Sequence, residues 1–176
     1  MKRAVLVNGI PASGKSTVAR MISDEMNWPL LALDAIKEAF FAHIGTGDRD
    51  YNRLLGKASY QAVFALIKDF PQGTTVVIDA WFGFQPTETF NGHMATAEIG
   101  QAVEIWCHAP DNVLGERYRA RLGKRHAGHL GEAYIPELIA LAETARPLGI
   151  QPRFEIDTAL PLDRGSLITW LGQNLA

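Results

Sequence analysis

The segment that most constrains this chain is residues 9–16, which read Gly-Ile-Pro-Ala-Ser-Gly-Lys-Ser and match the phosphate-binding pattern G-x-x-x-x-G-K-[S/T]. In this pattern the glycines let backbone N–H groups point at phosphate oxygens, the lysine neutralises the β- and γ-phosphates, and the last hydroxyl ligates magnesium. Residues 3–8 form a short apolar run before the loop, and apolar residues recur at helical spacing after it, at Val18, Ala19, Ile22 and Met26. We therefore expect a strand, a phosphate-binding loop and a helix in direct succession.

Strand and helix patterns alternate along the rest of the chain. Short apolar or β-branched runs predict further strands at residues 30–33, 74–78, 103–108 and 154–157. Helical spacing predicts helices at residues 35–43, 51–70, 87–99, 111–122, 135–145 and 166–175. This alternation is typical of a parallel sheet covered on both faces. We expect one α/β domain over residues 1–176, with the three-layer fold of P-loop nucleotide-binding proteins and a five-stranded parallel sheet in the order 2-3-1-4-5.

Two aspartates follow predicted strands, where open α/β sheets bind their ligands. Asp34 follows the second strand and could accept a proton from an acceptor hydroxyl as general base, or it could simply cap the next helix. Asp79 follows the run Val76-Val77-Ile78, as a magnesium-binding Walker B acid does, although a turn residue would also fit there. The spacing favours a functional role for Asp79 and does not divide the work between the two acids.

A basic segment is predicted to form a lid, over about residues 121–134. Arg117, Arg121 and Arg125 recur every four residues and lead into residues 123–131, a stretch with three glycines and little apolar content. Arginines that swing over a nucleotide can neutralise a transferring phosphoryl group and exclude water. The alternative is a solvated, basic helix end.

Other polar and aromatic residues give weaker indications. Trp81, Phe82 and Phe84, shortly after Asp79, could line an acceptor pocket or could belong to the core. His126 and His129 have no further metal ligand nearby in the sequence, so a metal site there is not expected. The single cysteine, Cys107, excludes an internal disulfide and indicates a reducing compartment.

Charge and hydropathy narrow the possible partners. The chain has 17 basic and 19 acidic residues, a net charge of −2, so it lacks the overall positive field that would hold a long polyanion. This argues against nucleic acid as a partner without excluding a local basic patch. No run approaches the roughly 18 apolar residues of a membrane span, and we expect a cytoplasmic protein, either a monomer or a homodimer.

Three segments resemble small P-loop kinases, in particular the group near chloramphenicol phosphotransferase and the kinase domain of phage polynucleotide kinase. They are residues 9–17, 33–36 and 117–125. The resemblance implies that Asp34 is the base and that ATP is bound by Gly9, Ile10, Pro11, Ala12, Ser13, Gly14, Lys15, Ser16, Thr17, Arg117 and Arg121. The lid also resembles that of gluconate kinases, but residues 31–36 lack their acidic, histidine-containing segment.

The sequence thus predicts a phosphotransferase that uses ATP and Mg²⁺ and transfers the γ-phosphate to a hydroxyl of a small antibiotic-, sugar- or nucleoside-like molecule. The expected catalytic residues are Asp34, Lys15, Arg121 and Arg125. Ser16 and Asp79 are expected at the metal, and the acceptor is expected to meet Asp34, Asp79, Trp81 and Phe82. Two alternatives stay open: a polynucleotide 5′-hydroxyl kinase, and a nucleotide-dependent switch or ATPase without an acceptor.

Overall fold

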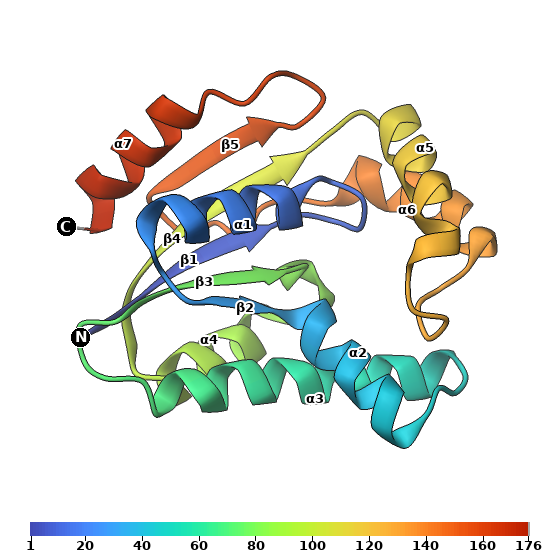
Figure 1. The fold of residues 1–176 in the computed structure, drawn as a ribbon, viewed down its shortest axis with the longest axis horizontal. Coiled ribbons are helices and arrows are strands. Elements are labelled where there is room, and N and C mark those ends of the chain that lie inside the picture. Colours follow the sequence, from blue (N-terminus) through green and yellow to red (C-terminus); the bar gives the residue numbers. More distant parts are fainter. Residues whose placement is uncertain (176) are drawn as a thin grey trace.

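The computed structural model describes residues 1–175 and contains one five-stranded parallel sheet with the order β2-β3-β1-β4-β5, which confirms the predicted fold class (Figure 1). The strands are β1 (Lys2–Asn8), β2 (Leu30–Ala32), β3 (Thr75–Ala80), β4 (Ile99–His108) and β5 (Arg153–Asp157). All five strands run the same way, so their carboxyl ends meet at one edge of the sheet. The two termini lie beyond the opposite edge (Figure 1).

The helices alternate with these strands as the sequence predicted. They are α1 (Lys15–Met26), α2 (Leu33–Ile44), α3 (Arg49–Lys68), α4 (Thr87–Thr96), α5 (Asp111–Arg121), α6 (Ile135–Thr144) and α7 (Arg164–Leu175), with short 3₁₀ turns η1 (Phe82–Phe84), η2 (Leu122–Lys124) and η3 (Glu132–Tyr134). One boundary differs in a way that matters for the site. The second strand ends at Ala32, so Asp34 lies in the first turn of α2, where a carboxylate is favoured by the helix dipole.

Helices cover both faces of the sheet (Figure 1). On one face α1 and α7 pack on the sheet through Ala19, Ile22 and Leu171, and on the other face α3 and α4 pack through residues that include Phe64 and Phe90. Side chains of β1 alternate between these two cores, with Val5 in the first and Leu6 in the second. A strand buried on both faces must be apolar throughout, which explains its continuous apolar run.

A third apolar cluster lies at the carboxyl edge of the sheet. There α5 and α6 pack Leu114, Tyr118 and Leu138 against two residues of the phosphate-binding loop, Ile10 and Ala12. The loop is therefore anchored by its own side chains, which leaves its backbone free to face the other way. Among residues 1–175, every helix is too short or too polar to cross a lipid bilayer.

Candidate active site

The phosphate-binding loop is bent by two glycines that no other residue could replace without strain. Gly9 has a φ of +155° and Gly14 a φ of +84°. A Cβ atom placed on Gly9 would lie 2.4 Å from the carbonyl oxygen of Cys107 and 2.4 Å from Ser13 Oγ. Gly14 is the N-cap of α1, so the unpaired N–H groups of the first turn of the helix open towards the cavity side of the loop.

The start of the loop is fixed by a buried polar network. Asn8 donates from Nδ2 to Glu104 Oε1 at 2.7 Å, and its Oδ1 accepts from the backbone N–H groups of Gly9 at 2.8 Å and Phe82 at 3.1 Å. Asn8 and Glu104 are both fully buried. One side chain thus joins the phosphate-binding loop to the segment that follows β3.

The back of the loop is supported by Thr158, which follows β5. Its hydroxyl donates to the Ser13 carbonyl at 2.8 Å, and Arg117 donates to Thr158 Oγ1 at 2.8 Å and to its carbonyl at 2.7 Å. Arg117, which the sequence placed on the nucleotide, therefore lies behind the loop in this structure and does not line the cavity. Thr17, also expected at the phosphates, is exposed on the first turn of α1.

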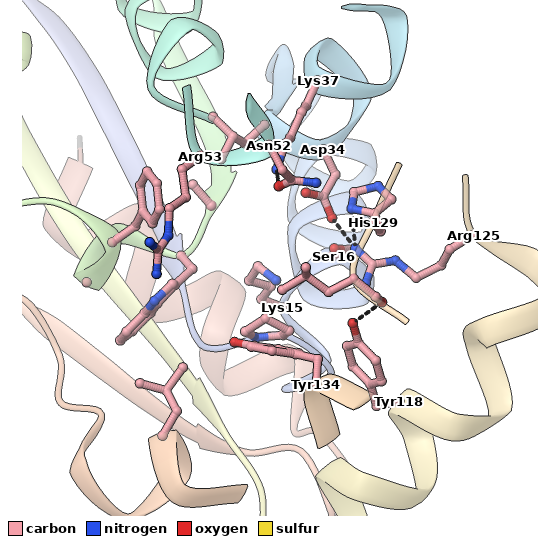
Figure 2. Close-up of a pocket in the computed structure, with 18 of the residues that line it drawn as sticks. Lys15, Ser16, Asp34, Lys37, Asn52, Arg53, Tyr118, Arg125, His129 and Tyr134 are labelled. Atoms are coloured by element: carbon pink, nitrogen blue, oxygen red, sulfur yellow. Dashed lines mark hydrogen bonds and ion pairs between the residues drawn. The ribbon is translucent and has the colours of Figure 1, made fainter. Parts of the chain in front are cut away.

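In front of the loop lies a cavity of about 550 Å³, bounded by α1, α2, α3, the end of β3, η1 and the predicted lid (Figure 2). This volume is typical of a site for a small ligand. The cavity brings together half of the site residues predicted from the sequence, namely Pro11, Lys15, Ser16, Asp34, Asp79, Trp81, Arg121 and Arg125.

One expected acceptor residue is wrongly assigned. Phe82 is 1% exposed and packs in the core with Tyr60 and Phe90, so it cannot meet a ligand in this cavity. Its neighbours Trp81 and Phe84 line the cavity instead. The 3₁₀ turn η1 buries Phe82, whereas Gly83 and Phe84, which follow it in the same turn, line the cavity.

Asp34 is surrounded by cations. Its side chain is 55% exposed, but the space it faces is the cavity, and Arg125 donates to its Oδ2 at 3.2 Å. Burial by itself would raise the pKa of Asp34, but the cations Lys15, Arg125 and Lys37 hold it below its ordinary value, and protonation of His129 would lower it further. Asp34 is therefore ionised at neutral pH, as a proton acceptor must be.

The predicted lid contacts α2 through a chain of hydrogen bonds. Arg125 lies 3.0 Å from His129 Nδ1 (Figure 2). His129 Nε2 lies 2.7 Å from Glu38 Oε1 on α2. Burial is the largest cause that lowers the pKa of His129, and the positive charge of Arg125 is the second. Together they outweigh the two carboxylates beside the ring. The neutral imidazole that results donates from Nε2 to Glu38 and accepts at Nδ1 from Arg125.

The tip of the lid is held in the same closed position. Asn52 on α3 donates to the Gly128 carbonyl, and a Cβ atom on Gly128 would lie 2.6 Å from the Phe41 ring. Tyr118 donates to the Leu130 carbonyl at 2.6 Å. The lid thus closes over the cavity through contacts with α2, α3 and α5.

This geometry predicts a pH-dependent lid contact. The pKa of His129 is lowered from 6.5, so the Arg125 contact is complete above pH 6.5 and is lost as the pH falls through the lowered value. A protonated Nδ1 cannot accept, and losing a hydrogen bond worth about 1 kcal/mol should speed amide exchange of residues 126–130 about fivefold, after correction for intrinsic rates. Hydrogen–deuterium exchange at pH 7.5 and pH 5 measures this.

The matched control is His129→Gln, in which exchange in this segment should be fast at both pH values. Asp34 does not produce the effect, because its lowered pKa keeps it ionised over this range. A pH-dependent change of equal size in the variant would show that another group is responsible.

Three buried polar atoms near the loop have no hydrogen-bond partner within residues 1–175: Ser13 Oγ, Asp79 Oδ1 and Arg121 Nε. Unpaired buried polar atoms are costly, so a site that leaves them open is suited to a polar ligand. Asp79 pairs with Val7 and Ala32 in the sheet register and so lies between the start of the loop and α2. With Lys15 and Ser16 lining the same cavity, these residues fit a nucleoside triphosphate and its magnesium ion.

Arg121 is suited to the same ligand. Burial, with the nearby Arg125, lowers the pKa of its guanidinium, which nevertheless stays charged. The Tyr118 ring lies 6.0 Å from Arg121 and 5.8 Å from Arg125 and holds both cations at the cavity wall. Two guanidinium groups this close repel each other, which a bound anion would relieve.

Most of the residues that α2 and α3 contribute to the cavity were not predicted from the sequence. Lys37, Asn52, Arg49, Arg53 and Lys57 line the cavity, together with Tyr134 and His129. A signal for part of this group was present, because Arg49, Arg53 and Lys57 are four residues apart and therefore lie on one helix face. No local pattern marked Lys37, whose position in the site depends on how α2 packs against α3.

The chain is similar to known proteins over most of its length. A family model described as an AAA domain, AAA_33, matches residues 5–143. The chain belongs to this family. The matched range contains the phosphate-binding loop, both aspartates and the lid, and members of the family are P-loop kinases.

Two curated relatives are similar over most of the chain. An uncharacterised protein of Mycobacterium tuberculosis is 28% identical over 170 residues, and mouse adenylate kinase 8 is 26% identical over 166 residues. These alignments cover 92% and 90% of this chain but 33% of each relative. The chain thus spans about a third of the length of the curated relatives it matches.

Solved structures share the whole fold. A candidate kinase from Chloroflexus aurantiacus superposes with a TM-score of 0.84 at 27% identity, covering 99% of both chains. A gluconokinase from Sinorhizobium meliloti gives a TM-score of 0.57 at 18% identity, covering 98% of this chain and 90% of its own, and shows the fold alone. These solved structures show that the chain has the fold of small kinases. A closer relation to chloramphenicol phosphotransferase or polynucleotide kinase remains a prediction.

Proposed function

We propose that this protein transfers the γ-phosphate of ATP to a hydroxyl group of a small molecule. The observation that carries the proposal is that one cavity holds the P-loop lysine, an ionised aspartate and two lid arginines. A protein that only binds a nucleoside triphosphate needs no more than the phosphate-binding loop. An ionised carboxylate that faces the same cavity supplies what an acceptor hydroxyl needs for attack.

The chain's own groups divide the work as follows. Lys15, with Arg121, binds the phosphate oxygens and stabilises the charge that develops during transfer. Asp34 orients the acceptor hydroxyl and takes its proton on a carboxylate oxygen. Ser16 and Asp79 would hold magnesium. ATP supplies the phosphoryl group, and magnesium supplies the positive charge that neutralises the phosphate oxygens.

Arg125 has a second role in this scheme. In the structure it occupies Asp34 Oδ2, so an acceptor hydroxyl has to displace this contact before Asp34 can accept its proton. The displaced guanidinium is then next to the phosphate-binding loop, where a cation favours transfer. The closed lid keeps water from competing with the acceptor.

The single-domain organisation and the mobility of residues 121–134 belong to this proposal. So do a cytoplasmic location and a monomeric or homodimeric state. Cys107 agrees with a reducing compartment, because burial raises its pKa to about 12 and keeps it an unreactive thiol.

The test is acceptor-dependent release of ADP from ATP and Mg²⁺, measured across a library of antibiotics, sugars, sugar acids and nucleosides. We expect at least one compound class to raise ADP release well above the basal rate, and EDTA to abolish the increase. ATP turnover that no compound accelerates would favour the switch or ATPase alternative. Transfer only to 5′-hydroxyl oligonucleotides would favour the polynucleotide kinase alternative.

A further inference from the structure

The cavity wall is far more basic than the chain as a whole. Seven Lys or Arg side chains line it against three carboxylates, whereas the chain has 17 basic and 19 acidic residues. These charges are unevenly placed along the cavity. The two ends therefore have to be considered separately.

At the phosphate-binding loop the charges are nearly balanced before any ligand enters. Lys15, Arg121 and Arg125 face Asp34 and Asp79. A nucleoside triphosphate with its magnesium ion is still an anion, and this end has only one cation in excess to meet it. The backbone N–H groups of the phosphate-binding loop and the N-terminus of α1 also bind phosphate, so the nucleotide is held without the cations at the far end.

Away from the loop four cations line the cavity, of which Lys37 lies near Asp34 and the other three face one carboxylate. Lys37 comes from α2, and Arg49, Arg53 and Lys57 come from one face of α3, with Glu137 of α6 opposite them. Figure 2 shows Lys37 and Arg53 extending into the cavity from these two helices. Only Arg49 is neutralised there, by its ion pair with Glu137.

The other three cations have weak partners or none. Lys37 donates to the neutral amide of Asn52, and Arg53 lies 3.6 Å from Asp50, whose side chain is 90% exposed. Within residues 1–175, no ion pair involves Lys57. Burial, helped by Arg125, lowers the pKa of Lys37 even though Asp34 is close by, as expected where positive charge is in excess.

Aromatic surface lies beside these cations. Trp81, Phe84 and Tyr134 line the cavity, and Phe84 and Lys37 Nζ both approach Gly56 of α3, at 3.6 Å and 3.9 Å from the position of its absent Cβ. A ligand that reaches Lys37 therefore meets the Phe84 ring as well. The same wall offers a flat apolar contact and a group of weakly paired cations.

From this charge distribution we propose that the acceptor is a small hydroxy acid, with a carboxylate or phosphate group bound by Arg53, Lys57 and Lys37 while its hydroxyl meets Asp34. This rests on the proposed phosphotransferase function. The aromatic residues would contact the body of the acceptor. An anionic acceptor also explains why α3 places like charges on one face, an arrangement that is otherwise unfavourable.

The test is a binding measurement in which the nucleotide site is first filled with Mg²⁺ and the β,γ-imido analogue of ATP. Calorimetry then compares matched pairs: D-glucuronate with D-glucose, D-glucose 6-phosphate with D-glucose, and quinate with its methyl ester. We expect the charged member to bind about tenfold tighter or better in at least one pair. Comparing the carboxylate pairs with the phosphate pair identifies the anionic group.

Variants locate the anion site. In the Arg53→Gln/Lys57→Gln double variant the preference for the charged member should fall about tenfold, while Lys68→Gln, a matched charge removal on the same helix outside the cavity, should leave it unchanged. Equal affinity for charged and neutral members throughout the panel would overturn the proposal. So would a preference that survives in the double variant.

Other outcomes separate this proposal from the one on which it rests. Phosphorylation of neutral and charged acceptors at equal rates would leave the kinase standing and remove the anion site. Binding of acids that are never phosphorylated would support the anion site and count against the kinase. Tighter binding of a 5′-hydroxyl oligonucleotide than of any small acid would show that the cations contact a nucleic acid backbone instead.

Discussion

Replacing Asp34 with Asn is expected to lower the rate of phosphoryl transfer about 10²- to 10⁴-fold, the usual contribution of a general base. The side chain keeps its size, but it can no longer take a proton. Nucleotide affinity should stay within about threefold, because removing a negative charge near Lys15 does not weaken an anion site. Steady-state kinetics and titration with a fluorescent ATP analogue measure the two effects separately.

Two control variants separate the role of Asp34 as a base from its contact with Arg125 of the lid. Asp34→Glu keeps a carboxylate and should retain more transfer activity than Asp34→Asn, although its geometry is altered. Asp24→Asn removes an exposed carboxylate from α1 and should change nothing. Full activity in Asp34→Asn would exclude Asp34 as the base and leave it as a residue of the first turn of α2.

Replacing Gly9 with Ala is expected to abolish nucleotide binding and to destabilise the fold by about 2 kcal/mol or more. The added Cβ would lie 2.4 Å from the Cys107 carbonyl, which is part of β4 and cannot move aside without breaking its strand. The φ of +155° adds strain of its own. Thermal unfolding together with nucleotide titration measures both losses.

The matched control for this substitution is Gly92→Ala, in the interior of α4. No atom lies within 4 Å of the position of its Cβ, so alanine should stabilise the protein by about 0.5–1 kcal/mol. If Gly9→Ala bound nucleotide as tightly as the unmodified protein, the close packing of the loop against β4 would not be needed for phosphate binding.

Much of the fold could be predicted from local patterns. The phosphate-binding loop requires a strand before it and a helix after it, and the apolar run of β1 marks a strand buried on both faces. Boundaries were less certain. The start of α2 at Leu33 was missed because the apolar residues of β2 continue into the helix without a break.

The predicted residues that line the cavity belong to the phosphate-binding motif, follow a predicted strand or stand in the basic lid segment. Lys15, Ser16, Asp34, Asp79, Arg121 and Arg125 are of these kinds. Phe82 was misplaced because the sequence does not show which aromatic residues after β3 are buried, and the turn η1 buries Phe82 while Phe84 lines the cavity. Arg117 was placed on the wrong side of the loop, because Thr158 lies 41 residues away in the sequence.

The sequence by itself determined that this protein has a phosphate-binding loop in a parallel α/β sheet, because both features depend on spacing between near neighbours. The tertiary structure decided what stands opposite that loop. Arg125 reaches Asp34 across 91 residues of sequence, and α3 turns its basic face towards the same cavity only through its packing on α2. Long-range packing and the electrostatics it creates, which no local pattern encodes, therefore determine which charges surround Asp34 and which charges line the cavity.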